Sequence, residues 1–156
     1  MSYLFIVLSY LIGSINFAYL VAKYKKLDIS SSGSGNPGTS NVMRTIGKKY
    51  AAIVLIGDVL KGFLPILLFS ENMLLCGFAA VIGHIYPIFY KFKGGKGVAT
   101  YIGVYIAFST LNPISYDLFE NSYFLFLNIP VLAAFYFVIF KISRISAIAS
   151  LLTVFI

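Results

Sequence analysis

The feature that most constrains this chain is its long apolar blocks, which contain few charged residues. Residues 3–22, 51–68, 73–90 and 124–140 each approach the roughly 20 residues that a helix needs to cross the hydrocarbon core of a bilayer. Only 11% of the 156 residues are charged, whereas soluble domains carry about 25%. Water would require more polar cover than this chain has. The sequence therefore predicts an all-α fold, a polytopic transmembrane helical bundle.

Two further apolar stretches are shorter. Residues 97–108 predict a tilted or partly buried span, and residues 145–156 predict a last, incomplete segment that is too short to cross alone. We therefore expect about six apolar segments in a single transmembrane domain over residues 1–156. The stretch at residues 1–22 lacks the basic start of a signal peptide and is about as long as a span, so we expect a retained helix.

The positive charges are confined to particular connections. Eleven of the twelve Lys and Arg residues lie at residues 23–49, 91–96 and 141–144, and the twelfth is Lys61. If six segments alternate, these three connections share one side of the membrane, and the other two contain no Lys or Arg. Because basic loops stay in the cytoplasm, we expect the N-terminus outside and the basic loops inside. The net charge of +7 then fits an anionic membrane surface or substrate better than nucleic acid.

The connection at residues 28–44 is rich in glycine and serine. Gly33, Gly35 and Gly38 permit backbone conformations that are closed to other residues, and such turns can direct several N–H groups at one anion. Neutral donors surround them, and a guanidinium suited to two phosphate oxygens follows: Ser34, Asn36, Thr39, Ser40, Asn41 and Arg44. The alternative interpretation is a flexible linker.

A second glycine loop, at residues 91–99, has Lys96 flanked by Gly94, Gly95 and Gly97. A helical stretch follows it. A glycine turn at a helix N-terminus favours phosphate, because N–H groups are exposed and the helix dipole attracts anions. The loop lacks the spacing of the nucleotide-binding P-loop, so the sequence does not indicate ATP. The alternative is a basic turn that only sets membrane topology.

Several polar residues lie inside the apolar segments, where ionisable groups are costly and often functional. His84 is either a general base or substrate-orienting group, or a packed neutral histidine. Asp58 and Lys61 share one helix face, which predicts an ion pair or part of a substrate site. Ser14 and Asn16 either face the same pocket or form hydrogen bonds between helices. No second histidine, and no cysteine or carboxylate at ligand spacing, is present, so we expect no metal.

Taken together, these motifs resemble the bacterial membrane acyl-phosphate:glycerol-3-phosphate acyltransferases of the PlsY type. The resemblance runs through nearly the whole chain and rests on residues 13–17 (GSINF), 32–44 (SGSGNPGTSNVMR), 58–62 (DVLKG), 83–87 (GHIYP) and 91–100 (KFKGGKGVAT). It implies an enzyme of phospholipid synthesis in the bacterial inner membrane. The acyl group would move from acyl phosphate to the 1-hydroxyl of glycerol 3-phosphate, giving lysophosphatidic acid without a cofactor.

The resemblance also implies roles for individual residues. Ser34 would contact phosphate or the oxyanion, Arg44 and Lys96 would hold the substrate charge, and His84 would orient the reacting groups. These four form the predicted catalytic set. The predicted substrate- or phosphate-binding set is Gly33, Gly35, Asn36, Gly38, Thr39, Asn41, Gly94, Gly95, Gly97, Asp58 and Lys61.

Two alternatives to the acyltransferase stay open. Family members continue with further apolar sequence and a third motif that carries a histidine and an asparagine, which these 156 residues do not contain. That departure leaves room for a catalytically inactive, truncated family member. The intramembrane charges leave room for a small transporter or channel for an organic anion, although the sequence shows no inverted repeat.

Overall fold

The computed structural model describes residues 2–69 and 72–110, and every element in these ranges is a helix. The apolar segments predicted at residues 124–140 and 145–156 lie outside the described residues. The chain divides into two compact units, Met1–Ala107 and Phe108–Ile156. All the predicted site residues lie in the first unit.

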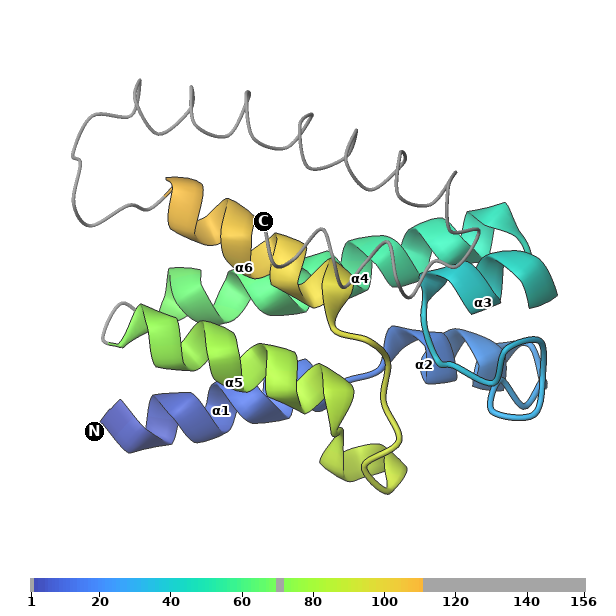
Figure 1. Cartoon of the computed structure of the whole chain (residues 1–156), viewed down its shortest axis with the longest axis horizontal. Coiled ribbons are helices and arrows are strands. Elements are labelled where there is room, and N and C mark those ends of the chain that lie inside the picture. Colours follow the sequence, from blue (N-terminus) through green and yellow to red (C-terminus); the bar gives the residue numbers. More distant parts are fainter. Residues whose placement is uncertain (1, 70–71, 111–156) are drawn as a thin grey trace, which may run out of the picture. The chain divides into compact units, whose positions relative to one another are not determined.

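The described helices confirm the all-α prediction (Figure 1). In chain order they are α1 (Ser2–Ser14), α2 (Phe17–Tyr24), α3 (Thr39–Thr45), α4 (Lys48–Leu68), α5 (Met73–Ile85), the short 3-10 helix η1 (Ile88–Tyr90) and α6 (Val98–Thr110). Within the described part, three stretches are long and apolar enough to cross a bilayer: Tyr3–Tyr24, Lys48–Leu68 and Met73–Tyr90. The 13 residues of α6 extend about 20 Å, less than the roughly 30 Å of hydrocarbon.

Glycines bring the long helices of the first unit into close contact. Gly13 and Gly83 lie where α1 meets α5, and Gly62 and Gly103 lie where α4 meets α6. A Cβ atom at any of these positions would overlap the backbone of the facing helix. Lipid gives no hydrophobic gain for burying large side chains between helices, so close backbone packing through small residues holds such bundles together.

The first apolar segment is not one continuous helix, contrary to the expectation from its length. α1 ends at Ser14 and α2 begins at Phe17. Asn16 caps α2, since its Oδ1 accepts a hydrogen bond from the Tyr19 N–H at 3.1 Å. Its Nδ2 donates to the Pro37 carbonyl at 3.4 Å. The break therefore joins the membrane segment to the first glycine loop.

Among the described residues, the hydrogen bond of the Ser14 side chain lies within α1, whereas the sequence suggested one between helices. Its Oγ donates to the Tyr10 carbonyl at 2.8 Å, one turn earlier in α1. A buried serine in an apolar helix can donate its hydroxyl hydrogen to a carbonyl of the preceding turn and so needs no partner helix.

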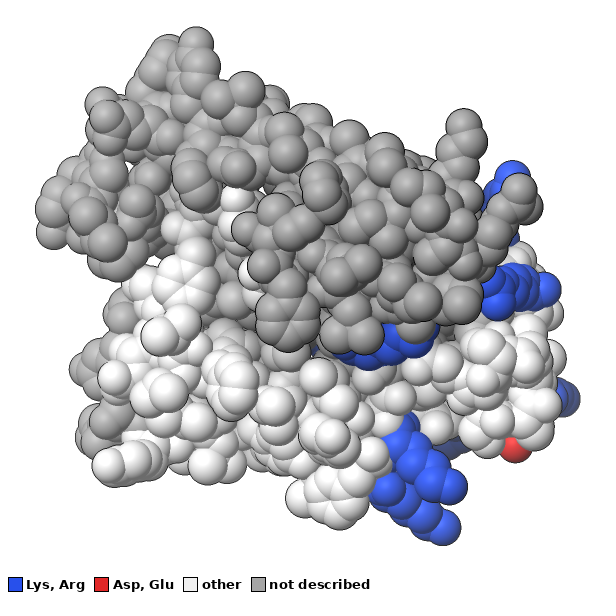
Figure 2. Space-filling model, viewed as in Figure 1, with Lys and Arg blue, Asp and Glu red and all other residues white. Residues whose placement is uncertain are grey.

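The basic connections of the first unit share one end. In Figure 1 the connections that flank α3 and the connection from α5 to α6 lie at the same end, and the end of α4 and the start of α5 lie at the other. Figure 2 shows the visible Lys and Arg side chains gathered at the end that carries the connections flanking α3. Both glycine loops therefore lie among the positive charges.

Candidate active site

The first glycine loop is held in shape by Asn41. This residue is 1% exposed, and its Oδ1 accepts a hydrogen bond from the Ser34 N–H at 2.9 Å. Its Nδ2 donates to the carbonyls of Ser32, at 2.9 Å, and Ile29, at 3.4 Å. Gly33 adopts a φ of 59°, a left-handed conformation that favours glycine. The loop is an internally bonded turn, and both hydrogens of the Asn41 amide are used within it.

We expect Asn41→Ala to destabilise the protein by about 1–3 kcal/mol, because it leaves buried backbone groups of the loop without partners. Thermal unfolding of the purified chain in detergent measures the effect. Asn36→Ala is the matched control, since Asn36 lies in the same loop and is only partly buried. Equal unfolding temperatures for wild type and Asn41→Ala would show that Asn41 does not shape the loop.

The second glycine loop packs on the C-terminal end of α5. The Gly95 N–H donates to the His84 carbonyl at 3.2 Å. A Cβ on Gly94 would overlap the carbonyl oxygens of His84 and Ile85, and a Cβ on Gly95 would overlap the His84 imidazole. Gly97, with a φ of 80°, turns the chain into α6. These glycines are required mainly because the end of α5 leaves no room for side chains.

The two glycine loops lie side by side. The Cβ position of Gly95 is 3.2 Å from the Pro37 carbonyl oxygen, the same oxygen that Asn16 contacts. Partial burial lowers the pKa of Lys96, and the nearby positive charge of Arg44 lowers that pKa further. Even so, Arg44 and Lys96 both remain exposed to solvent. Two like charges held close together repel each other, and an anion bound between them would relieve that repulsion.

A buried polar cluster joins α4 and α5 to the break between α1 and α2. Lys61 Nζ lies 2.8 Å from Asp58 Oδ1 and donates a hydrogen bond to the Ile15 carbonyl at 2.6 Å. His84 Nδ1 lies 3.5 Å from the same Asp58 oxygen. All three side chains are 4% exposed or less. The pair predicted from the spacing of Asp58 and Lys61 is present, and it has two further neighbours.

His84 connects this cluster to the second glycine loop. Its Nδ1 faces Asp58, while its Nε2 edge lies against Gly95, whose added Cβ would also come within 3.0 Å of Cε1. The imidazole is therefore restrained on both sides. A ring held in this way has a fixed orientation beside the second glycine loop, which suits a group that positions its neighbours in the site.

The remaining predicted residues occupy different positions around the loops. Thr39 begins α3, and its Oγ1 is buried with no hydrogen-bond partner in the part of the chain that the structure describes. Ser34 is exposed, although its N–H is held by Asn41. Gly38 precedes α3 in an extended conformation. An unpaired buried hydroxyl is unusual in proteins, so Thr39 Oγ1 is a candidate donor to a ligand.

Several groups at the candidate site were missed by the sequence reasoning. The carbonyls of Ile15 and Pro37 are main-chain groups, and no residue type marks them. The available signal was Asn16, a residue type that commonly caps helices, placed inside an apolar run. Thr100, whose buried Oγ1 also has no partner among the described residues, was not singled out either.

A family model described as glycerol-3-phosphate acyltransferase matches residues 3–156. A relative of that name from Aquifex aeolicus is 47% identical over 111 residues, which cover 67% of this chain and 58% of the relative. One from Pseudomonas paraeruginosa is 40% identical over 158 aligned residues, which cover 97% of this chain and 75% of the relative. The chain thus spans less than two thirds of the Aquifex relative.

The fold also matches a solved structure. The crystal structure of PlsY (YgiH), an integral membrane glycerol 3-phosphate acyltransferase, aligns in its glycerol 3-phosphate form with a TM-score of 0.77 and 36% identity. The match covers 96% of this chain and 70% of that one. The family match over nearly the whole length agrees with the motifs, the helical fold and the paired glycine loops. The chain belongs to the glycerol-3-phosphate acyltransferase family.

Proposed function

We propose that the chain is a membrane acyltransferase that moves an acyl group from acyl phosphate to the 1-hydroxyl of glycerol 3-phosphate. The observation that carries the proposal is the meeting of the two glycine loops, with Arg44 and Lys96 near each other. Both substrates are anions, and the product lysophosphatidic acid is a lipid. Family membership supports this reaction, and the two PlsY structures are a glycerol 3-phosphate form and a lysophosphatidic acid form.

The chemistry needs little more than positioning and charge. The hydroxyl oxygen attacks the acyl carbonyl carbon. The bond between that carbon and the oxygen that bridges to phosphorus then breaks, and inorganic phosphate leaves with the electron pair. The hydroxyl proton passes to a phosphate oxygen or to His84. Holding the two substrates together supplies a large part of the acceleration. Because acyl phosphate is already activated, the reaction needs no nucleotide, metal or covalent intermediate.

The described contacts support a separate role for each group of residues. Arg44 and Lys96 stabilise the negative charge on the phosphate that leaves acyl phosphate and on the phosphate of glycerol 3-phosphate. Backbone N–H groups of the glycine loops, with Ser34 and Thr39 Oγ1, donate to phosphate or carbonyl oxygens. His84, restrained between Asp58 and Gly95, orients the hydroxyl. The Asn41 amide and the Asp58–Lys61 pair act through the groups that they hold.

We further propose that the glycine loops face the cytoplasm from the inner membrane of a bacterial cell, with the N-terminus outside and about six apolar segments in residues 1–156. The gathering of Lys and Arg at one end of the first unit supports this orientation (Figure 2). A site at the cytoplasmic surface also suits one water-soluble substrate, one acylated substrate and a lipid product.

The test is formation of lysophosphatidic acid by the purified chain in detergent, supplied with palmitoyl phosphate and glycerol 3-phosphate. We expect Arg44→Ala and Lys96→Ala each to lower kcat by about 100-fold or more, because each removes charge stabilisation from the reacting phosphate. Lys48→Ala is the matched control, an exposed lysine at the start of α4. Near-full activity in both test variants would show that the site is misplaced.

The two alternatives give different results in the same system. A transporter would carry glycerol 3-phosphate into proteoliposomes without chemical turnover. An inactive family member would fail to complement a strain that lacks its acyltransferase, whereas the proposed enzyme restores growth.

A further inference from the structure

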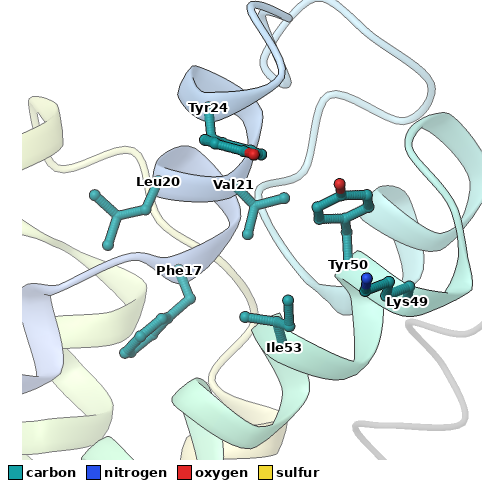
Figure 3. Close-up of a pocket in the computed structure, with 7 residues that line it drawn as sticks. All are labelled: Phe17, Leu20, Val21, Tyr24, Lys49, Tyr50 and Ile53. Atoms are coloured by element: carbon teal, nitrogen blue, oxygen red, sulfur yellow. The ribbon is translucent and has the colours of Figure 1, made fainter.

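A second feature of interest is a groove of about 440 Å³ between α2 and α4 (Figure 3). None of its lining residues belongs to the two glycine loops, and no part of the proposed reaction uses it. Its lining residues come from the two facing helices: Phe17, Leu20, Val21 and Tyr24 from α2, and Lys49, Tyr50 and Ile53 from α4. Figure 3 shows the four lining side chains of α2 and the three of α4. The apolar side of the groove is the part lined by Phe17, Leu20 and Ile53, and its polar side is the part lined by Tyr24, Tyr50 and Lys49.

The apolar side of the groove opens outward. Leu20 is 45% exposed and Ile53 is 46% exposed, although both belong to stretches long and apolar enough to span a bilayer. The Phe17 ring packs against Gly57, where a Cβ would overlap it. This ring closes the inner wall of the groove. Exposed apolar side chains on such a helix suit an acyl chain better than they suit water.

The polar side of the groove carries two positive charges. Lys49 lines it directly, and Lys25 Nζ lies 4.3 Å from the Tyr50 ring centre and 5.8 Å from the Tyr24 ring centre. A hydrogen bond to Tyr50 raises the pKa of Lys25, so this lysine stays charged. No acidic residue is among the seven that line the groove. Lysine and tyrosine together at the end of a span are typical of the membrane–water interface.

We propose that this groove binds an anionic phospholipid of the surrounding membrane. One acyl chain lies along Leu20 and Ile53, and the phosphate headgroup lies between Lys25 and Lys49, where the tyrosine hydroxyls can donate hydrogen bonds. The two lysines favour an anionic headgroup over a zwitterionic one, because each adds attraction to negative lipid. The apolar side favours a lipid over free phosphate.

Tryptophan fluorescence can test the occupant, because the chain has no tryptophan of its own. Leu20→Trp places a single reporter at the groove. The variant is reconstituted in bilayers that contain phosphatidylglycerol or phosphatidylcholine with brominated chains, which quench nearby tryptophan. We expect brominated phosphatidylglycerol to bind beside the reporter about tenfold more tightly than brominated phosphatidylcholine. The double substitution Lys25→Gln with Lys49→Gln should remove that preference.

The matched reporter is Phe89→Trp, at a residue of η1 that is 60% exposed and close in sequence to Lys91 and Lys93. It measures how strongly lysines attract anionic lipid without a groove, and we expect a preference of no more than about twofold there. The proposal would be overturned by equal quenching by the two lipids at Leu20→Trp, by an unchanged preference in the lysine double variant, or by the same preference at Phe89→Trp. Loss of the preference on adding inorganic phosphate, at constant ionic strength, would show a phosphate site and would also overturn it.

Discussion

Gly95→Ala is expected to lower kcat for lysophosphatidic acid formation by about 100-fold or more while the helices still form. The added Cβ would overlap the His84 imidazole and lie 3.2 Å from the Pro37 carbonyl oxygen. The ring or the loop must therefore move, and a displacement of about 1 Å in a site that works by positioning costs about 100-fold in rate. Steady-state turnover per folded protein measures the effect.

Gly47→Ala is a control for backbone strain. Gly47 has a φ of 120°, but nothing lies within 4 Å of the position its Cβ would take. We expect this variant to lose stability and to keep its turnover within about twofold, because it contacts none of the site residues. Adding Gly95→Ala to His84→Ala should cost little more than His84→Ala alone, since the overlapping ring is gone. Full activity in Gly95→Ala would contradict the packing of the second loop against His84.

Lys61→Met is expected to cause the largest loss of stability of any single substitution proposed for this chain, about 3–5 kcal/mol. It leaves the Asp58 carboxylate buried without its ion-pair partner and the Ile15 carbonyl without its donor. Thermal unfolding in detergent gives the stability, and steady-state kinetics on the folded fraction gives kcat and KM.

The kinetic pattern distinguishes positioning from substrate binding. If Asp58 and Lys61 act through His84 and the helix break, Asp58→Asn lowers kcat and leaves the KM for glycerol 3-phosphate within about threefold. The double variant Asp58→Asn with Lys61→Met should be less damaging than the sum of the two, because no buried charge remains unpaired. A KM raised tenfold or more at unchanged kcat would instead make this pair a substrate ligand.

Much of the fold was readable from the sequence because membrane spans depend on apolar length. The blocks at residues 51–68 and 73–90 correspond closely to α4 and to α5 with η1. The break between α1 and α2 was not readable in the same way. Hydropathy averages over side chains along one stretch of sequence. At the break, the Ile15 carbonyl accepts a hydrogen bond from Lys61, which lies 46 residues later in the chain.

Some local features of the candidate site could be predicted from the sequence, and others could not. The positive φ angles of Gly33, Gly35 and Gly97 follow from residue type. The spacing of Asp58 and Lys61 indicated their pairing. Composition presented Asn41 as one more donor for phosphate, whereas the structure shows it buried, with three hydrogen bonds to the backbone of its own loop. Such an assignment needs the coordinates, because a buried and an exposed asparagine look alike in a sequence.

The central claim is that the two glycine loops form one cationic site, and the pKa of Lys96 tests it most directly. Carbon-13 methylation of the lysines allows that pKa to be followed by nuclear magnetic resonance in the folded chain, with Lys96→Arg used to assign the signal. If the guanidinium of Arg44 lowers the pKa of Lys96, Arg44→Gln will raise it, and Lys48→Gln will not. An unchanged pKa of Lys96 in Arg44→Gln would place the two loops apart and contradict the shared site.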